Sequence, residues 1–593
     1  MVRTLLFCMI LFSSTLLGGN RAQNSAGKPI LGGEPSRTLS PQEVGGIQNG
    51  SPGISIVQGE KNTNWDWQSY GGDERHLWVL PDGSVHAVYN GNTGMITVAS
   101  GDSLRSYYSY SPDSGRTFIK PVAVQAETAH NPAMAITPDG RALIASSKAK
   151  SPVGIWISAD SSCGSGKFTL FKIPEIPKYG VYPRLSVVSE SLAVFIGLSM
   201  KTKENIWNVF NFKTNTFLHD TNLVAFPGIK NQNGIIVTSN RAGKVAMLVS
   251  RSCGFPLSGV SGDNNIWMQE SLDGGVTWGE PEMITHLSSK PEGDQTMLGW
   301  CFSALYVGDE LHVVWAEASI PENGEFVDGL EWIIHWANGV NNGKPTVAVK
   351  WDLLHFGQKY MYGTIGIPRI GSDEDGILTI VFTSCYNDAQ HHGAYGLNYW
   401  DISAVSSEDN GLRWGEPTNL TNSVKIDDTY PYISEWNQSG KINILYQTDT
   451  QSGQVGEGGQ QFVGKVDHLF LQTDHPSTVP YETGPYTEDP NDVKDSPEAQ
   501  PDHFALEQNY PNPFNPSTSI LYSLAEKAYV SMKIHDLLGR EIRTLFAGDQ
   551  TAGSHRAEWN GLDDRGGRVP SGIYFYTLTA KGFRETRKLV MLR

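Results

Sequence analysis

Positive charge is scarce in this chain of 593 residues, which carries 45 Lys and Arg against 62 Asp and Glu and a formal net charge of -17. A surface with this balance repels phosphate backbones, so we expect no nucleic-acid partner. Charged residues of both signs make up only 18% of the chain, whereas Gly and Trp are frequent, at 63 and 16 residues. That composition is typical of an all-β protein with many turns.

Long apolar runs are almost absent, and the one near the N-terminus is too short to span a bilayer comfortably. It extends from Leu5 to Leu17, follows a single positive charge at Arg3 and ends in small and polar residues. This arrangement predicts a secretory signal peptide over residues 1–22, cleaved after Ala22. No later stretch is apolar enough to cross a membrane, so we expect an exported protein without a membrane-spanning segment.

Cysteine is also scarce, with five residues in all, of which Cys8 lies inside the signal peptide. The other four are scattered, at Cys163, Cys253, Cys301 and Cys385. Their spacing excludes a dense disulfide scaffold and a zinc site built from paired cysteines. Four cysteines allow three pairings, so buried free thiols and at least one disulfide both remain open.

Motifs for cofactors and metals are missing as well. The sequence has no Gly-rich phosphate loop that opens a helix and no Gly-x-Ser-x-Gly elbow. His391 and His392 are adjacent, and neighbouring side chains of an extended chain point to opposite sides, so they are unsuited to share a metal. We therefore predict neither a cofactor nor a metal site.

The chain instead contains a repeated hairpin, in which two alternating apolar runs flank a turn that is often Asp-Gly. Clear copies occupy residues 76–89, 133–145 and 302–315, and looser copies begin near residues 184, 233, 369 and 432. Asp-Gly between alternating runs is a strong hairpin signal because Gly accepts a positive φ. The spacing of about 59 residues predicts seven units, each a four-stranded blade of a β-propeller.

A dipeptide ending in proline opens several of these hairpins. The five copies are Asn131-Pro132, Tyr182-Pro183, Phe226-Pro227, Ile367-Pro368 and Tyr430-Pro431. Because proline has no N–H to donate to a ladder, the pattern predicts that it occupies the first residue of each inner strand.

A second turn in the unit has the pattern Ser-x-Asp-x-Gly-x-Thr-aromatic. The Asp carboxylate suits the backbone N–H groups of the turn, Gly suits the left-handed position, and the aromatic side chain suits packing between strands. Capping of this kind is the expected role of these aspartates, rather than calcium binding, because they fall in separate units. Two full copies and one with Arg413 in place of Thr are formed by Ser111, Asp113, Gly115, Thr117, Phe118; Ser271, Asp273, Gly275, Thr277, Trp278; and Ser407, Asp409, Gly411, Trp414.

These turns resemble the Asp-box, or BNR, repeat of sialidases and many other propellers. A sialidase resemblance would imply an arginine triad, a Tyr–Glu nucleophile pair and an Asp acid. That family carries Tyr/Phe-Arg-Ile-Pro before its first Asp-box and has six blades. Residues 23–110 contain no such motif, and residues 367–370 contain the same residue types only in another order. We therefore assign no catalytic residue, and a sialidase-like glycoside hydrolase stays only an alternative to ligand recognition.

The C-terminal part has a different pattern. Residues 474–503 are rich in proline and acidic residues, which predicts an extended linker. Short alternating runs follow, at 519–524, 529–535, 541–546, 555–559, 572–580 and 586–592. That number of short strands in about 90 residues predicts an immunoglobulin-like β-sandwich.

Specific motifs accompany these strands. They begin with Gln508-Asn-Tyr-Pro-Asn-Pro-Phe-Asn-Pro-Ser-Thr518 and continue with Asp536-Leu-Leu-Gly-Arg540, Trp559-Asn-Gly561 and Ser571-Gly-Ile-Tyr-Phe-Tyr576. Together with the closing Thr586–Arg593, they resemble the type A C-terminal sorting domain of type IX secretion substrates. The resemblance implies passage through the periplasm, an outer-membrane translocon and a sorting-domain peptidase as partners, and a secreted or cell-surface product. The alternative is an ordinary immunoglobulin-like module that assists binding.

The predicted organisation is thus a signal peptide over 1–22, a flexible lead-in over 23–60, an Asp-box propeller over 61–473, a linker over 474–503 and a sorting domain over 504–593. Residues at the starts of inner strands commonly face the central channel or its rim. Arg with Tyr and Trp around such a mouth suits a carboxylated sugar or a peptide acid, although each Arg also suits a structural bond to the channel wall. The candidate ligand-binding residues are His130, Tyr182, Arg184, Trp300, Arg369, Asp428 and Tyr430.

Three functions follow from this organisation. The favoured one is recognition of a glycan or protein ligand by an exported propeller. The second is an extracellular glycoside hydrolase or lyase that acts at the propeller mouth and needs two suitably separated carboxyl groups. The third is a structural component of the cell surface.

Overall fold

The computed structural model divides into two compact units, Met1–Glu488 and Asp489–Arg593. It describes residues 54–57, 75–92, 104–125, 129–148, 154–174, 180–199, 201–226, 234–250, 265–285, 295–320, 331–350, 365–385, 399–423, 426–449, 466–481, 483, 504–506, 509, 514, 518–551, 553–565 and 567–591. The predicted signal peptide, most of the lead-in and the second half of the linker lie outside these residues.

The described part of the first unit forms seven antiparallel sheets, which confirms the seven-bladed propeller. Blades 1 to 3 comprise β2 (Leu77–Val79), β3 (Val85–Asn92), β4 (Leu104–Ser111), β5 (Val122–Ala123); β6 (Ala129–Ile136), β7 (Ala142–Lys148), β8 (Gly154–Asp160), β9 (Phe168–Lys172); and β10 (Gly180–Val187), β11 (Leu192–Ser199), β12 (Asn205–Asn211), β13 (Thr216–Phe217), β14 (Leu223–Ala225).

Blades 4 to 7 follow the same order. They comprise β15 (Gly234–Ser239), β16 (Val245–Ser250), β17 (Ile266–Ser271), β18 (Glu282–Met283); β19 (Gln295–Val307), β20 (Glu310–Ile320), β21 (Glu331–Ala337), β22 (Thr346–Lys350); β23 (Ile365–Asp373), β24 (Leu378–Cys385), β25 (Trp400–Ser407), β26 (Thr418–Asn419); and β27 (Asp427–Ile433), β29 (Lys441–Asp449), β30 (Asp467–Asp474), β1 (Ile54–Ile56). A short β28 (Trp436–Asn437) pairs in parallel with β23, and η2 (Asn341–Gly343) precedes β22.

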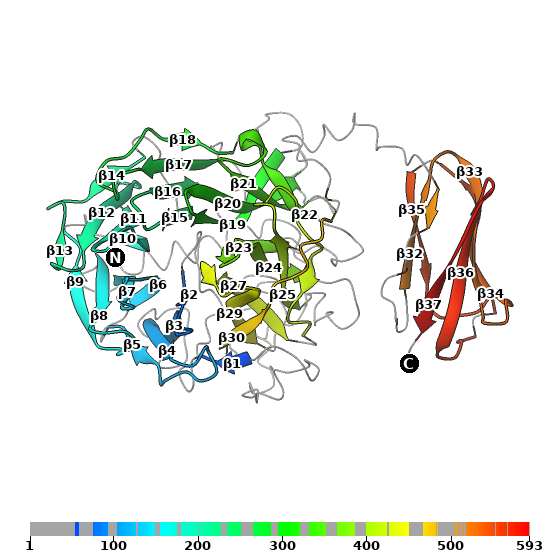
Figure 1. Ribbon diagram of the computed structural model, residues 1–593, viewed down its shortest axis with the longest axis horizontal. Coiled ribbons are helices and arrows are strands. Elements are labelled where there is room, and N and C mark those ends of the chain that lie inside the picture. The colour runs from blue at the N-terminus through cyan, green and yellow to red at the C-terminus, as the bar shows by residue number, and fades with distance from the viewer. Residues whose placement is uncertain are drawn as a thin grey trace, which may run out of the picture. The chain divides into compact units, whose positions relative to one another are not determined.

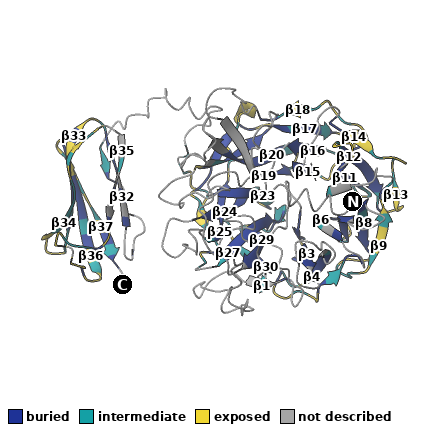
Figure 2. Cartoon of the chain, turned by 180° about the vertical axis from the view of Figure 1, so that it is seen from behind, coloured by how far each residue is buried: buried dark blue, intermediate teal, exposed yellow. Residues whose placement is uncertain are grey.

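The blades surround a centre toward which each presents its first strand: β2, β6, β10, β15, β19, β23 and β27 (Figure 1). Apolar side chains fill the gaps between neighbouring blades, and each gap has its own buried cluster because alternate residues of an inner strand face opposite neighbours. Leu143 and Phe195, for example, pack between blades 2 and 3, whereas Met134 and Tyr108 pack between blades 1 and 2. Burial accordingly falls from the inner to the outer strands (Figure 2).

An N-terminal strand closes the ring. Ile54, Ser55 and Ile56 pair with Leu471, Phe470 and Leu469, so β1 is the outermost strand of blade 7. The lead-in prediction is therefore wrong for these residues, since strand pairing begins before residue 61. A three-residue strand within a Gly- and Pro-rich segment has too weak a local pattern to be recognised without its partner.

Proline at position 55 is expected to loosen this closure. The N–H of Val57 donates to His468 O at 3.0 Å, and Ser55 lies two residues earlier on the same side of the ladder. Ser55→Pro removes a ladder donor and should cost about 2 kcal/mol in the free energy of unfolding. Ser55→Thr, which keeps the N–H and the hydroxyl, is the control, and urea unfolding with limited proteolysis is the measurement. Equal stability of the two variants would show that β1 does not hold the ring.

Prolines lie inside the inner strands rather than at their first residues, so that prediction is wrong. Pro132, Pro183, Pro368 and Pro431 each lie within a strand, at a β-bulge where the register to the neighbouring strand shifts. The bulge leaves one residue out of the ladder, and a residue without an N–H fits there at no loss. Phe226 follows the outer strand β14, so Phe226-Pro227 opens no hairpin.

The first part of the predicted linker also belongs to the propeller unit. Gly415 forms a bridge with Pro480, the N–H of Tyr481 donates to Trp414 O at 2.7 Å, and Thr483 Oγ1 donates to Val347 O at 3.0 Å. An acidic, proline-rich composition predicted an extended chain, and extended chain can still lie along a blade edge.

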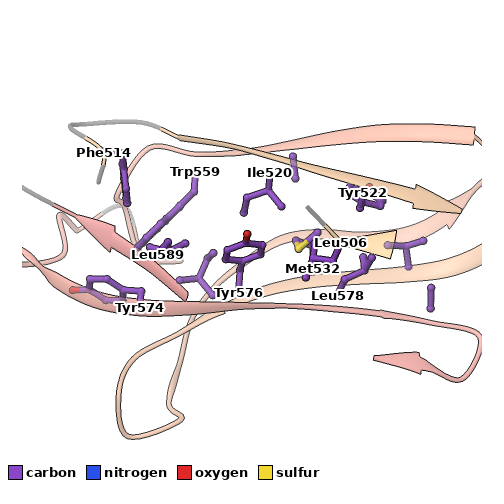
Figure 3. Packing of buried hydrophobic residues seen from close by; sticks show 14 of the residues in the cluster. Leu506, Phe514, Ile520, Tyr522, Met532, Trp559, Tyr574, Tyr576, Leu578 and Leu589 are labelled. Atoms are coloured by element: carbon purple, nitrogen blue, oxygen red, sulfur yellow. The ribbon is translucent and has the colours of Figure 1, made fainter. Parts of the chain in front are cut away.

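The second unit is a sandwich of two sheets, as predicted. β31 (Ala505–Leu506), β32 (Thr518–Leu524) and β35 (Gly553–Trp559) form one sheet, and β34 (Glu541–Gln550), β33 (Ala528–His535), β36 (Gly572–Ala580) and β37 (Phe583–Met591) form the other. Phe514, Trp559, Tyr574, Tyr576 and Leu589 lie in the core between them (Figure 3). In the part of the chain that the structure describes, no helix is long and apolar enough to cross a membrane.

Candidate functional site

The bulges on the inner strands share an unusual backbone conformation. Asn131, Tyr182, Ile367 and Tyr430, each followed by proline, have φ between +50° and +56°. Positive φ is rare for aromatic and β-branched residues and persists only where the surroundings impose it. Here the bulge repeats in blades 2, 3, 6 and 7, so it is a feature of the inner strand rather than of one site.

Arg184 and Arg369 occupy equivalent places, directly after the bulge proline of blades 3 and 6. Both side chains are buried at 1% exposure. Arg184 donates to Pro183 O at 2.9 Å and to Ile235 O of blade 4 at 3.0 Å, and Arg369 donates to Pro368 O at 3.1 Å. These bonds are of the structural kind considered for both residues: Arg184 joins its bulge to the inner strand of the next blade, and Arg369 bonds to the proline of its own bulge.

A third arginine, Arg75, reaches across the centre. It precedes the inner strand of blade 1, donates to Ala304 O of blade 5 at 3.1 Å and forms an ion pair with Glu435 of blade 7. Its guanidinium also lies 5.9 Å from the ring centroid of Trp78. Arg241, from the turn between β15 and β16, lies 4.6 Å from the same ring, so cations of two blades converge on Trp78.

Aromatic and imidazole rings fill the neighbouring gap between blades 7 and 1. His76 stacks on Tyr432 at 4.2 Å, and His468 lies 4.6 Å from Tyr89. Arg369 lies 5.6 Å from the ring of Tyr432. Burial lowers the pKa of His468 to about 3, with a further contribution from His76, so its imidazole is neutral at pH 7. These contacts make the central strands a closely packed polar and aromatic core.

Asp428 is brought together with Asp401, a residue that the sequence did not single out. Both carboxyl groups are buried, and Ser423 contacts both: its Oγ donates to Asp428 at 2.7 Å, and its N–H donates to Asp401 at 2.9 Å. Asp401 also accepts from Thr421 Oγ1 at 3.0 Å and from Asn419 Nδ2 at 2.6 Å. Burial, and then the charge of Asp401, raise the pKa of Asp428 to about 7.

Replacing Asp428 by asparagine is expected to stabilise the protein at pH 8. A carboxyl group whose folded pKa is raised binds its proton more tightly when folded, so its stabilising contribution is present below about pH 4 and lost as the pH rises through 7. The change corresponds to a free energy on the order of 4 kcal/mol. Asp428→Asn should remove this loss, with the gain over wild type vanishing below pH 4 in urea unfolding curves.

Asp401→Asn is the matched comparison for that variant. Asp401 accepts three hydrogen bonds, and an amide cannot accept them all without turning its NH2 toward a donor. Asp401→Asn should therefore destabilise the protein at pH 8, the pH at which Asp428→Asn stabilises it. A wild type and an Asp428→Asn variant with the same pH dependence would show that Asp428 is ionised at neutral pH.

The remaining sequence-predicted residues are spread over several blades. His130 on β6 and Trp300 on β19 lie on inner strands, but the structure does not describe their side chains. Tyr182 is half-buried in the gap between blades 3 and 4, and Tyr430 is buried in the apolar cluster between blades 7 and 1. Sequence reasoning missed Arg75, His76, Asp401, Tyr432 and His468; of these, only Tyr432 follows a bulge proline, which was a signal available in the sequence.

The three Asp-box turns share one hydrogen-bond pattern. In each, the Ser hydroxyl contacts the Asp carboxylate at 2.7 to 2.9 Å, and the Gly N–H donates to that hydroxyl at 2.9 Å. The carboxylate then accepts the N–H of the residue four positions later, which holds the turn closed. These bonds lower the pKa of Asp113 and Asp273 to about 2. Gly115, Gly275 and Gly411 have φ of +77°, +87° and +84°, which suits glycine alone.

The two ends of the blades differ in the connections they carry. At one end, β19 ends at Val307 and β20 begins at Glu310, and other first-to-second-strand turns are similarly short. At the opposite end, second-to-third-strand connections run from Asn92 to Leu104, Ser250 to Ile266, Cys385 to Trp400 and Asp449 to Asp467. Because the strands are antiparallel, the links between successive blades leave from this same end. We call it the long-connection face.

Comparison with known proteins matches the second unit to one family model. The FlgD Ig-like domain matches residues 515–582, which agrees with the sandwich. No curated protein shows a significant match to the chain.

Solved structures resemble the chain in fold. A protein of unknown function from Dyadobacter fermentans is 11% identical, with 60% of this chain and 98% of that chain covered and a TM-score of 0.36. The intramolecular trans-sialidase from Ruminococcus gnavus is 9% identical, with 73% and 100% covered and a TM-score of 0.37. The β-propeller domain of the Trilobed protease from Pyrococcus furiosus is 11% identical, with 70% and 99% covered and a TM-score of 0.35. Similarity at this level transfers no activity to this chain.

Proposed function

We propose that the chain is an exported β-propeller that binds a glycan or protein ligand on the long-connection face. The difference between the two ends of the blades carries this proposal. Long connections held by a rigid scaffold are where binding residues concentrate, and loops of this length without a structural need are usually functional. The other end is occupied by tight turns whose polar groups bond one another.

The composition of these connections supports a recognition surface. Residues 351–364 contain Trp351, Phe356, Tyr360 and Tyr362, and residues 386–399 contain several further aromatic and His residues. Aromatic side chains supply large contact areas with an apolar face and, in Tyr and Trp, a polar edge. Such side chains stack on sugar rings and also form the anchors of protein interfaces.

Binding is tested on the full mature chain with a glycan array, followed by mass spectrometry of the bound glycans. A variant in which a short Gly-Ser linker replaces residues 387–398 should lose binding while keeping its unfolding midpoint. Leu412→Ser is the control, because Leu412 is 46% exposed in the Asp-box turn of the same blade. Equal loss in both variants, or no loss in either, would contradict the proposed face.

Turnover of a bound glycan would favour the alternative of a glycoside hydrolase or lyase at the propeller mouth. The buried carboxyl pair Asp401 and Asp428 gives this alternative a starting point, since a carboxyl group whose pKa is raised, as that of Asp428 is, suits the role of a general acid. Both groups accept hydrogen bonds from neighbouring hydroxyl groups, which favours a structural role. Binding of neither glycan nor protein would favour a structural surface component.

We also propose that residues 504–593 act as a type IX secretion sorting domain and direct the propeller to the cell surface or the medium. The ordered motifs from Gln508 to Arg593 support this proposal. Its expected partners are the outer-membrane translocon and the sorting-domain peptidase.

A further inference from the structure

Asparagine followed by glycine is the dipeptide in which an asparagine loses its side-chain amide most readily. Glycine has no Cβ to shield its backbone nitrogen, so that nitrogen can reach the carboxamide carbon of the preceding asparagine. The sequence contains eight such pairs, and the structure describes both residues of five of them. The five described pairs begin at Asn90, Asn338, Asn342, Asn410 and Asn560; the asparagines of the other three, Asn49, Asn233 and Asn323, lie outside the described residues.

Two groups must be free for this reaction. The carboxamide has to turn toward the following nitrogen, and the N–H of the glycine has to give up its proton. A hydrogen bond that fixes either group slows the reaction, because that bond must break first. The hydrogen bonds of the five described pairs therefore determine which of them reacts fastest.

The carboxamide is the fixed group in two of the pairs. Asn90 is 2% exposed in β3, and its carboxamide oxygen accepts from the N–H of Asn131 at 3.2 Å. The carboxamide oxygen of Asn338 accepts from the N–H of Leu311 at 3.3 Å. Both side chains are thus held away from the following glycine.

The glycine N–H is the fixed group in two further pairs. The N–H of Gly343 donates to Val340 O at 2.8 Å. The N–H of Gly411 belongs to an Asp-box turn and donates to the hydroxyl of Ser407 at 2.9 Å. In these pairs the nitrogen that would attack is already engaged.

Asn560 differs from the other four asparagines. Its side chain is exposed in the turn that follows β35. In the part of the chain that the structure describes, neither its carboxamide nor the N–H of Gly561 has a hydrogen-bond partner. The neighbouring groups are fixed instead, because Trp559 Nε1–H donates to Leu562 O at 2.9 Å. The N–H of Val569 also donates to the carbonyl of the glycine at 3.0 Å.

We propose that Asn560 is a site of spontaneous deamidation, which adds a negative charge to the second unit as the protein ages. The Gly561 nitrogen attacks the carboxamide carbon of Asn560, the bond from that carbon to the amide nitrogen breaks, and ammonia leaves with the proton of the glycine N–H. Water then opens the resulting succinimide ring at either of its two carbonyls. The products are aspartate and isoaspartate at position 560, and isoaspartate lengthens the backbone beside Trp559.

Peptide mass spectrometry of the full chain, incubated at pH 8.5, tests this proposal. The peptide that contains Asn560 should gain about 1 Da as an amide becomes a carboxyl group. Its rate should exceed the rates of the other four described pairs by at least about fivefold, because each of those must first break a hydrogen bond. Asn560→Gln is the matched control: its peptide should not change, and the other peptides should react as in the wild type.

The same incubation in urea separates the effect of the structure from that of the sequence. The five pairs should react at similar rates in the unfolded chain, because the protecting hydrogen bonds are lost. Ser407→Ala, which removes the acceptor of the Gly411 N–H, should raise the rate at Asn410 in the folded chain and leave Asn560 unaffected. Equal rates of the five pairs in the folded wild type would overturn the proposal, as would an Asn560 peptide that changes only in urea.

Discussion

Acidification from pH 7 to pH 4.5 is expected to lower the free energy of unfolding of the propeller by several kcal/mol. The cause is a set of buried histidines that are neutral in the folded protein. Burial lowers the pKa of His86 and His312 to about 4 and of His468 to about 3, and it lowers the pKa of His335 as well. These side chains ionise freely only after unfolding.

The sign and the pH window follow from proton linkage. Between pH 6.5 and about 4 the unfolded chain binds protons at these positions and the folded chain does not. The free energy of unfolding therefore decreases as the pH decreases through this range. Each fully titrated imidazole with a folded pKa near 4 contributes about 3 kcal/mol. Asp428, whose pKa is raised to about 7, changes stability in the opposite direction and offsets roughly one histidine.

A substitution in the pair formed by His312 and His335 tests this pH dependence most directly. Their rings lie 5.2 Å apart with His312 Nδ1 and His335 Nε2 at 2.9 Å, and His335 also contacts Thr346 Oγ1 at 3.2 Å. His312→Gln cannot be protonated and should reduce the pH slope of the unfolding free energy by about 1.4 kcal/mol per pH unit between pH 6 and 4.5.

Urea unfolding followed by tryptophan fluorescence measures this slope. Trp559 is the only tryptophan in the sequence of the second unit, so the signal reports mainly on the propeller unit. His535→Gln is the control, because that side chain is half-exposed and lies on the second unit. A wild type with constant stability from pH 7 to 4.5 would show that the buried imidazoles are already protonated or compensated.

Truncation of Trp559 is expected to unfold the second unit and to stop export of the whole chain. Trp559 is fully buried, packs against Phe514 at 5.5 Å and Tyr574 at 5.2 Å, and donates its Nε1–H to Leu562 O at 2.9 Å. Trp559→Ala should cost about 3 to 5 kcal/mol, which is most of the stability of a domain of this size.

The functional readout depends on the proposed sorting role. If a translocon recognises the second unit in its folded form, Trp559→Ala should leave a folded propeller in the periplasm. Little of the protein should then reach the medium or the cell surface. Tyr529→Ala is the control, since Tyr529 is 64% exposed on the same unit. Normal delivery of Trp559→Ala, with the second unit shown to be unfolded, would separate this unit from export.

The repeat pattern was sufficient to predict the seven blades, because each Asp-Gly or equivalent turn joins two strands that are neighbours in the sequence. The bulge prolines were misplaced for a physical reason: their position depends on how the inner strand pairs, and not on local preference. β1 was missed because its partner β30 lies more than 400 residues away in the chain.

The candidate site was predicted less well than the fold. The inner-strand location of Arg184, Arg369, Asp428 and Tyr430 follows from the hairpin pattern, and the structure places them there. The direction in which each Arg points depends on the bulge and on the next blade, which no single hairpin encodes. Asp401 belongs to the third strand of blade 6, so its meeting with Asp428 arises only when two blades pack.

The pairing of β1 with β30 also determines how early the propeller ring can close during synthesis of the chain. Residue 54 leaves the ribosome long before residue 471, and at 5 to 20 residues per second the delay is roughly 20 to 80 s. Blades 1 to 6 are synthesised one after another within that interval, whereas blade 7 stays incomplete until its end, and contacts of such sequence separation form slowly. Pairing of β1 with β30, and with it closure of the ring, therefore cannot begin before residue 471 has been synthesised.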